Sequence, residues 1–275
     1  MKRMSTIILL VLVGWFGMAQ AMPLTGGHYK PKWTQLPDMV DGDDNLSMHR
    51  SGGPVVADDF VSDGRVIAGF HWWGSYLDDP ATGQSFDTGQ GPERNVQFEI
   101  SFHENCPANS ADPDCVGAGG VPHPFSTPKN GNYFSAIFDV EEDFYGTTDD
   151  GIDIYEYWIS VEGTPGPSFL NFTWDEIAGE TYWVDFAWAA GQFGTDFNAD
   201  VWGWAKADNS GICILDCAVT TAAGVGGNPH IGPWTELVGE DKAFEVITVP
   251  EPGSILLMGL GLLGMGLGYR KKARV

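Results

Sequence analysis

The feature that most constrains the fold is a nine-residue run, 95–103, in which polar and apolar side chains alternate without a break. Side chains of an extended strand point to opposite faces in turn, so the run has one apolar and one polar face. The apolar face holds Val96, Phe98, Ile100 and Phe102. Strands with a single wet face are typical of antiparallel sheets, and the run therefore predicts such a sheet.

Similar runs recur along the chain between turns rich in Gly, Pro and Asp. They cover residues 65–73, 133–140, 152–161, 169–174, 181–188 and 242–248. No stretch of the body of the chain shows the 3.6-residue apolar period of a helix, and at most residues 175–179 form a helical turn. Many short strands with turn punctuation predict an all-β fold, an antiparallel two-sheet sandwich of jelly-roll-like winding.

The strand pattern predicts one domain over residues 55–248, because it never pauses long enough for a linker. Residues 22–54, rich in Pro, Gly and Asp, predict an irregular lead-in to this domain. Two segments, 106–129 and 208–233, predict long loops, and binding sites of sandwiches tend to lie on such loops.

Both ends of the chain predict export. Lys2 and Arg3 precede an apolar run, 7–16, and small residues end at Ala21, which predicts a signal peptide over 1–21 that signal peptidase cuts after Ala21. At the other end, residues 253–269 are free of charged side chains and would form a transmembrane helix about 25 Å long. Basic residues follow it and stay in the cytoplasm, so the body faces the periplasm.

The order of parts over residues 249–275 resembles the PEP-CTERM sorting signal of Gram-negative bacteria. A stiff break, Val249, Pro250, Glu251 and Pro252, precedes the apolar span and the basic end. The resemblance implies that an exosortase cuts near the Pro-Glu-Pro triplet. It also implies a transient inner-membrane tether and then delivery to the cell surface or the extracellular matrix of polysaccharide. An ordinary tail anchor is the alternative.

The chain is strongly acidic, with a formal net charge of −23. Phosphate binding needs clustered Lys and Arg, so the composition argues against nucleic acid as a partner. Divalent cations and neutral glycans suit it better. The plainer interpretation is that the charge keeps an exported protein soluble.

Four cysteines enter an oxidising compartment, where disulfides persist. Four cysteines allow three pairings. We favour Cys106 with Cys115 and Cys213 with Cys217, because each pair brackets a short loop that contains an acidic residue. A zinc site is the alternative, although neither spacing is that of a zinc knuckle.

Several short segments of the body are distinctive. They are Ala57-Asp58-Asp59-Phe60, residues 69–76, residues 179–183, Trp202-Gly203-Trp204 and residues 243–246. Together they resemble an uncharacterised family of exported bacterial β domains, often carried by planctomycetes and by PEP-CTERM proteins. The resemblance implies fold and habitat, and no activity.

Tryptophans are the candidate binding residues. Trp72 and Trp73 are adjacent and must face opposite sides of a strand, so one belongs to the core and the other is available to stack on a sugar ring beside His71. Trp202 and Trp204 form a second candidate platform. Core packing is the default interpretation for most tryptophans, and sugar stacking is the alternative to it.

Asp196, Asn198 and Asp200 have the alternate spacing that opens an EF-hand loop. Val201 stands where that loop needs Gly, and Ala207 where it needs Glu. A structural calcium ion here, or at residues 41–45, is therefore the alternative to ordinary turn residues. No other cofactor is expected.

Catalytic motifs are missing from the sequence: it has no Gly-x-Ser-x-Gly elbow, no His-Glu-x-x-His helix and no phosphate-binding Gly loop. We therefore predict a non-enzymatic, exosortase-processed surface or matrix protein that binds exopolysaccharide. The alternatives are a secreted glycoside hydrolase that uses paired carboxylates on this polysaccharide and a purely structural envelope protein.

Overall fold

The structure is a computed structural model that describes residues 30–40, 44–48, 54–77, 96–117, 120–160, 176–189, 201–209, 211–221 and 232–248. Several predictions lie outside these residues: the signal peptide, the strand 169–174, the calcium ligands Asp196, Asn198 and Asp200, and the transmembrane helix 253–269. Within the described residues no helix has the length and apolar character to span a membrane.

The described elements confirm the all-β prediction, because they comprise twelve strands and one short 3₁₀ turn, η1 (Pro113–Cys115). The strands are β1 (Lys30–Gln35), β2 (Asp44–Leu46), β3 (Val56–Val61), β4 (Ile67–Leu77), β5 (Val96–Cys106), β6 (Thr127–Thr147), β7 (Asp153–Ser160), β8 (Thr181–Trp188), β9 (Val201–Ala205), β10 (Val219–Thr221), β11 (Trp234–Glu236) and β12 (Phe244–Thr248).

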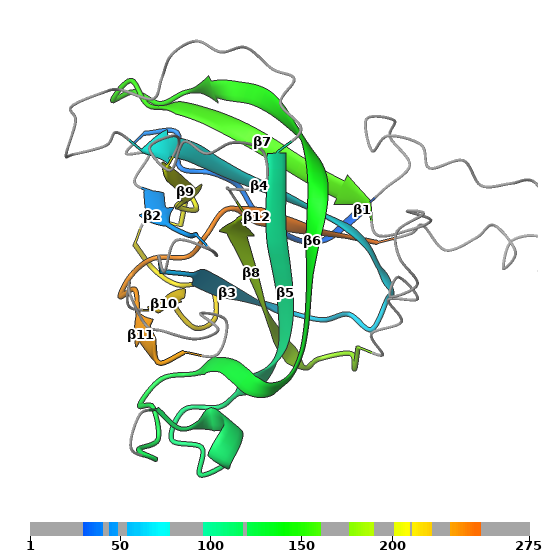
Figure 1. Cartoon of the computed structure of the whole chain (residues 1–275), viewed down its shortest axis with the longest axis vertical. Helices are drawn as coiled ribbons and strands as arrows, with labels where there is room; N and C mark the ends of the chain where they lie inside the picture. Colours follow the sequence, from blue (N-terminus) through cyan, green and yellow to red (C-terminus); the bar gives the residue numbers. More distant parts are fainter. Residues whose placement is uncertain are drawn as a thin grey trace, which may run out of the picture.

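The strands form two antiparallel sheets that share the long strand β6 (Figure 1). Sheet I has the order β1-β12-β4-β7-β6, with β9 and then β2 paired to the far end of β4. Sheet II has the order β6-β5-β8-β3-β10-β11. Residues 127–140 of β6 pair with β5, and residues 141–147 pair with β7, so one continuous strand passes from one sheet to the other.

From β3 to β10, successive strands alternate between the two sheets, and β6 belongs to both. β3, β5 and β8 belong to sheet II, whereas β4 and β7 belong to sheet I. As a result β3-β8-β5 lies in one sheet and β4-β7-β6 in the other. This alternation is the jelly-roll-like winding that the sequence predicts.

The main core lies between the sheets and is largely aromatic. Sheet II contributes Phe98 and Phe186, and sheet I contributes Trp72 and Trp202. The Trp72 and Phe186 rings stack with centroids 4.4 Å apart, and the Phe98 and Trp202 rings meet edge to face at 4.7 Å. Aromatic pairs of this kind add about 1 kcal/mol each to the area they bury.

The predicted irregular lead-in is partly wrong, because β1 and β2 lie within residues 22–54. β1 pairs with β12 and β2 pairs with β9. The register of β1 shifts between Pro31 and Trp33, as expected where a proline removes a ladder hydrogen bond at a sheet edge. These strands depend on partners that lie far along the chain, Lys30 opposite Thr248 and Asp44 opposite Ala205, so local sequence does not reveal them.

Candidate functional site

The four tryptophans predicted to stack on sugar are buried, and that prediction is wrong for each of them. Trp72, Trp202 and Trp204 are 0% exposed and fill the core between the sheets. Trp73 points to the opposite side of β4, as the alternation requires, but it is only 2% exposed because it packs in a second cluster with Met39. A sugar ring has no access to these four indoles.

Trp158 of β7 is the indole on the outer face of sheet I that remains partly exposed. Its backbone lies directly opposite His71 of β4, and the two ring centroids are 6.2 Å apart. The indole Nε1 donates a hydrogen bond to Glu141 Oε2 at 3.1 Å. The surface tryptophan beside His71 is therefore Trp158 from another strand, and not Trp72 or Trp73 as predicted.

Strand register places this tryptophan in a row that crosses sheet I. The row runs through Thr34, Glu245, His71, Trp158 and Glu141 on β1, β12, β4, β7 and β6. Thr34 Oγ1 donates to Glu245 Oε1 at 3.1 Å. Neighbouring side chains of the row thus touch one another across the strands.

His71 is held between two carboxylates. Its Nε2 lies 3.0 Å from Glu156 Oε2, and its Nδ1 lies 3.1 Å from Glu245 Oε2. Burial lowers the pKa of His71, but the hydrogen bonds and charges of Glu156 and Glu245 outweigh it and raise the pKa above its ordinary value. A protonated imidazole has two N–H donors, which is what two carboxylate partners require.

A second row lies next to the first. Trp73, Glu156 and Asp143 are in register on β4, β7 and β6. Tyr145, 42% exposed, packs edge-on against Trp73 with centroids 5.7 Å apart. We define the outer-face site as the residues of the two rows other than Thr34 and Trp73, together with Tyr145. Its members are His71, Glu141, Asp143, Tyr145, Glu156, Trp158 and Glu245.

Two other polar clusters lie in the interior of the protein and not on its surface. Under the outer side of sheet II, His103 Nε2 lies 3.0 Å from Asp185 Oδ2, and both side chains are 0% exposed. The Nδ1 of His103 must carry a proton, because it lies 3.1 Å from the carbonyl oxygen of Lys129. With both nitrogens occupied by structural partners, His103 is not placed to act on an outside substrate.

The second interior cluster contains the acidic pair of the segment Ala57-Asp58-Asp59-Phe60. Asp58 and Asp59 are 0% and 1% exposed. Burial and the neighbouring Asp241 raise the pKa of Asp58, and burial with the charge of Asp216 raises the pKa of Asp59 to about 8. The backbone N–H of Lys242 donates to Asp58 Oδ2 at 2.6 Å. A polysaccharide cannot reach these carboxyls.

Both disulfides of the sequence prediction are confirmed. Cys106 bonds to Cys115 and Cys213 bonds to Cys217, with Cα–Cα distances of 5.3 and 5.0 Å. All four thiols are consumed, so the zinc alternative is wrong. The described part of the chain holds no group of three or more His, Cys, Asp or Glu arranged for a metal ion.

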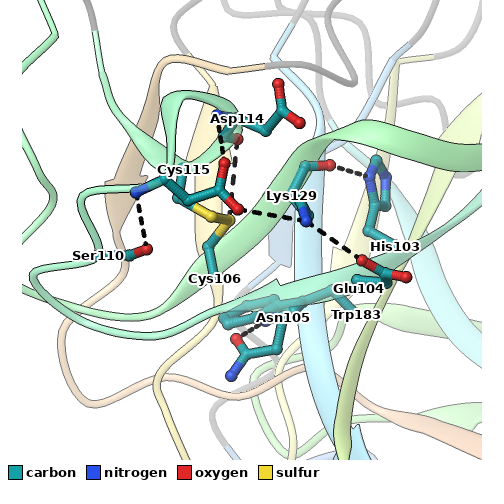
Figure 2. Close-up of a disulfide and its surroundings, with 10 residues drawn as sticks. His103, Glu104, Asn105, Cys106, Ser110, Asp114, Cys115, Lys129 and Trp183 are labelled. Carbon is teal, nitrogen blue, oxygen red and sulfur yellow. Dashed lines mark hydrogen bonds and ion pairs between the residues drawn. A yellow bond between two sulfur atoms is a disulfide. The ribbon is translucent and has the colours of Figure 1, made fainter.

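The first disulfide anchors the loop that follows β5 (Figure 2). Lys129 Nζ lies 3.4 Å from Glu104 Oε2 and 3.3 Å from Asp112 Oδ2, so it ties β6 to β5 and to this loop. His103 points at the Lys129 backbone from the neighbouring strand. The long loop predicted over 106–129 is shorter in the structure, because Cys106 ends β5 and β6 begins at Thr127.

Comparison with known families matches residues 31–247, most of the chain, to the family described as "Domain of unknown function (DUF7901)". The chain belongs to this family. Residues 248–272 of this DUF7901 protein match the PEP-CTERM protein-sorting motif, which confirms the sorting signal predicted from the sequence. Comparison with curated proteins and with solved structures finds no match.

The residues of the outer-face site were largely missed at the level of sequence. In the predicted strand 152–161, Trp158 alternates with the same register as Glu156 and Ser160, so all three side chains point to one face. Because Glu156 and Ser160 are polar, this face is expected to point outward. That signal was available and would have identified Trp158. The pairing of Trp158 with His71 and Glu141 depends on the order of strands in sheet I, which no local pattern contains.

Proposed function

We propose that this DUF7901 protein is an exported, exosortase-processed surface or matrix protein that is not an enzyme and that binds exopolysaccharide through the outer-face site. The observation that carries the proposal is Trp158, a partly exposed indole on an open sheet face with carboxylates on the strands beside it. Indole faces stack on the apolar faces of sugar rings, while carboxylates and imidazoles bond to their hydroxyls.

The position of the sorting motif supports the exported state. The motif begins at residue 248, the last residue of β12. An exosortase that cuts near Pro250 would therefore release the protein after its last described strand, with sheet I complete. Before that cut, signal peptidase and the inner membrane would be its partners, and afterwards the cell surface or the matrix.

The distribution of acids favours binding over hydrolysis. A glycosidase needs two carboxyl groups about 5 to 10 Å apart that flank the bond to be cut. Here Asp58 and Asp59 are buried, and Glu156 and Glu245 are each engaged by His71. The partly exposed indole of Trp158 beside this row supports binding over a purely structural role, the other alternative.

Affinity electrophoresis tests the proposal. Exported protein from cells that produce the full chain is run in gels that contain polysaccharide purified from the same cells. We expect retardation that weakens about tenfold in Trp158→Ala, since an aromatic contact is worth roughly 1 kcal/mol or more. The matched control is Phe125→Ala, a half-buried aromatic packed under sheet II, which should migrate like the unmodified protein. Equal retardation of Trp158→Ala would overturn the proposal.

A further inference from the structure

We infer that the outer-face site selects a polysaccharide that carries protonated amines, such as a partly de-N-acetylated hexosamine polymer. This inference rests on the proposed function and names the ligand class of that same site. Its basis is the placement of acidic groups around Trp158.

Two acidic residues of the site come from opposing positions on neighbouring strands. Asp143 of β6 and Glu156 of β7 occupy directly opposite positions, an arrangement in which like charges repel across the strands. Glu141, two residues from Asp143 on the same side of β6, adds a third negative charge and bonds to the Trp158 indole. Such a cluster on an exposed surface favours a cationic ligand.

The lysines and arginines of the described residues do not neutralise this cluster. His71 supplies one positive charge, and it is shared by Glu156 and Glu245. Neither Glu141 nor Asp143 forms an ion pair with any lysine or arginine of the described ranges. Among the described residues, therefore, no lysine or arginine competes with a cationic ligand for Glu141 and Asp143.

An amino sugar matches both parts of the site. Its ring face can stack on Trp158, and its ammonium group can then lie near Glu141 and Asp143, where carboxylate and indole both attract a cation. A polyuronate fails for the opposite reason, because its carboxylates would meet this cluster on a chain of net charge −23. An N-acetylated polymer would keep the stacking and lose the ion pairs.

Calorimetric titration of the exported protein with three oligosaccharides of equal length tests the inference. The probes are a glucosamine hexamer, its fully N-acetylated form and a hexamer of a uronic acid. We expect the glucosamine hexamer to bind about tenfold more tightly than the acetylated one, as two exposed ion pairs would give. The uronic acid hexamer should not bind measurably.

The charge variant is Glu141→Gln combined with Asp143→Asn, which keeps the shape of both side chains. It should remove the preference for the glucosamine hexamer and leave the affinity for the acetylated hexamer unchanged. The control is Asp114→Asn, which removes an exposed acid from the loop closed by the Cys106–Cys115 disulfide. This control should retain the tenfold preference.

The outcomes separate this inference from the proposed function. If both hexosamine forms bind equally, or neither binds while the native polysaccharide does, amine selection is wrong and polysaccharide binding stands. If Trp158→Ala also leaves binding of the native polysaccharide unchanged, both are wrong. A preference that survives in the double variant would likewise overturn the role of Glu141 and Asp143.

Discussion

His71 and Trp158 lie directly opposite each other on β4 and β7, with ring centroids 6.2 Å apart on the outer face of sheet I. Each of the two rings is tied to a glutamate of another strand, His71 to Glu245 of β12 and Trp158 to Glu141 of β6. Four adjacent strands thus fix the geometry of one surface. A binding site built on paired strands keeps its shape without a ligand.

The protonated state of His71 makes one contribution to stability depend on pH. The pKa of His71 is raised in the folded protein, so the contribution is fully present below the ordinary pKa of about 6.5 and is lost as pH rises through the folded pKa. We expect NMR titration to place the His71 pKa above that of an exposed histidine. The variant His71→Gln should lose this part of the pH dependence of unfolding, and an unshifted pKa would contradict the arrangement.

Asp59 should act in the same sense, over a wider range of pH. Its pKa is raised to about 8, so between the ordinary value and about 8 the folded protein holds a proton that the unfolded chain releases. The free energy of unfolding should therefore fall as pH rises through this window. Urea denaturation at about pH 5 and about pH 9 should show this loss, and Asp59→Asn should reduce it. A variant with the same pH profile as the unmodified protein would contradict the assignment.

Replacing a core tryptophan with alanine should lower the free energy of unfolding much more than replacing a surface tryptophan. Trp72 is 0% exposed and stacks on Phe186, so Trp72→Ala should destabilise the protein by about 3 to 5 kcal/mol. Trp158 is partly exposed, and Trp158→Ala should cost about 1 kcal/mol or less. Thermal unfolding of the two variants measures the difference. Similar losses would mean that Trp158 belongs to the core.

The disulfide Cys213–Cys217 fixes a loop that contacts a buried carboxylate. The backbone N–H of Ile214, inside this loop, donates to Asp241 Oδ2 at 2.7 Å, and Asp241 is 1% exposed. Replacing both cysteines with alanine should destabilise the protein by about 2 kcal/mol, the value expected for such a short closed loop. A urea midpoint that does not move would show that the loop stays docked without its bond.

The sequence predicted the parts of the fold that local alternation determines. The strand 181–188 matches β8 in both bounds, and the apolar face of 95–103 supplies Phe98, Ile100 and Phe102 to the core. In these strands the side-chain period of two coincides with one buried face. The short bracketed loops likewise identified both disulfides correctly.

What the sequence did not predict depends on distant partners. The strand expected at 133–140 extends over 127–147 because two different sheets pair with its two halves. Trp202 and Trp204 were predicted to share a face, and they do share the core, but only the opposing sheet determines that this face is buried. The outer-face site could not be predicted from the sequence for the same reason, since its seven residues come from four strands.

The sorting signal should govern where the protein ends up. Deleting residues 250–275 removes the predicted membrane helix and the triplet, so the protein should still enter the periplasm and should no longer reach the cell surface. Immunoblots of periplasmic, surface and medium fractions measure this distribution. Surface delivery of the truncated protein would contradict exosortase processing.

The central claim is that the outer-face site holds the protein in the polysaccharide matrix, and its most direct test is the fraction retained by washed cells. Cells that produce the full chain with Trp158→Ala are compared with cells that produce the unmodified chain or the control Phe125→Ala. The account predicts that the Trp158 variant is exported and folded but is recovered mainly in the medium. Retention of this variant in the matrix at the level of the unmodified protein would contradict the account.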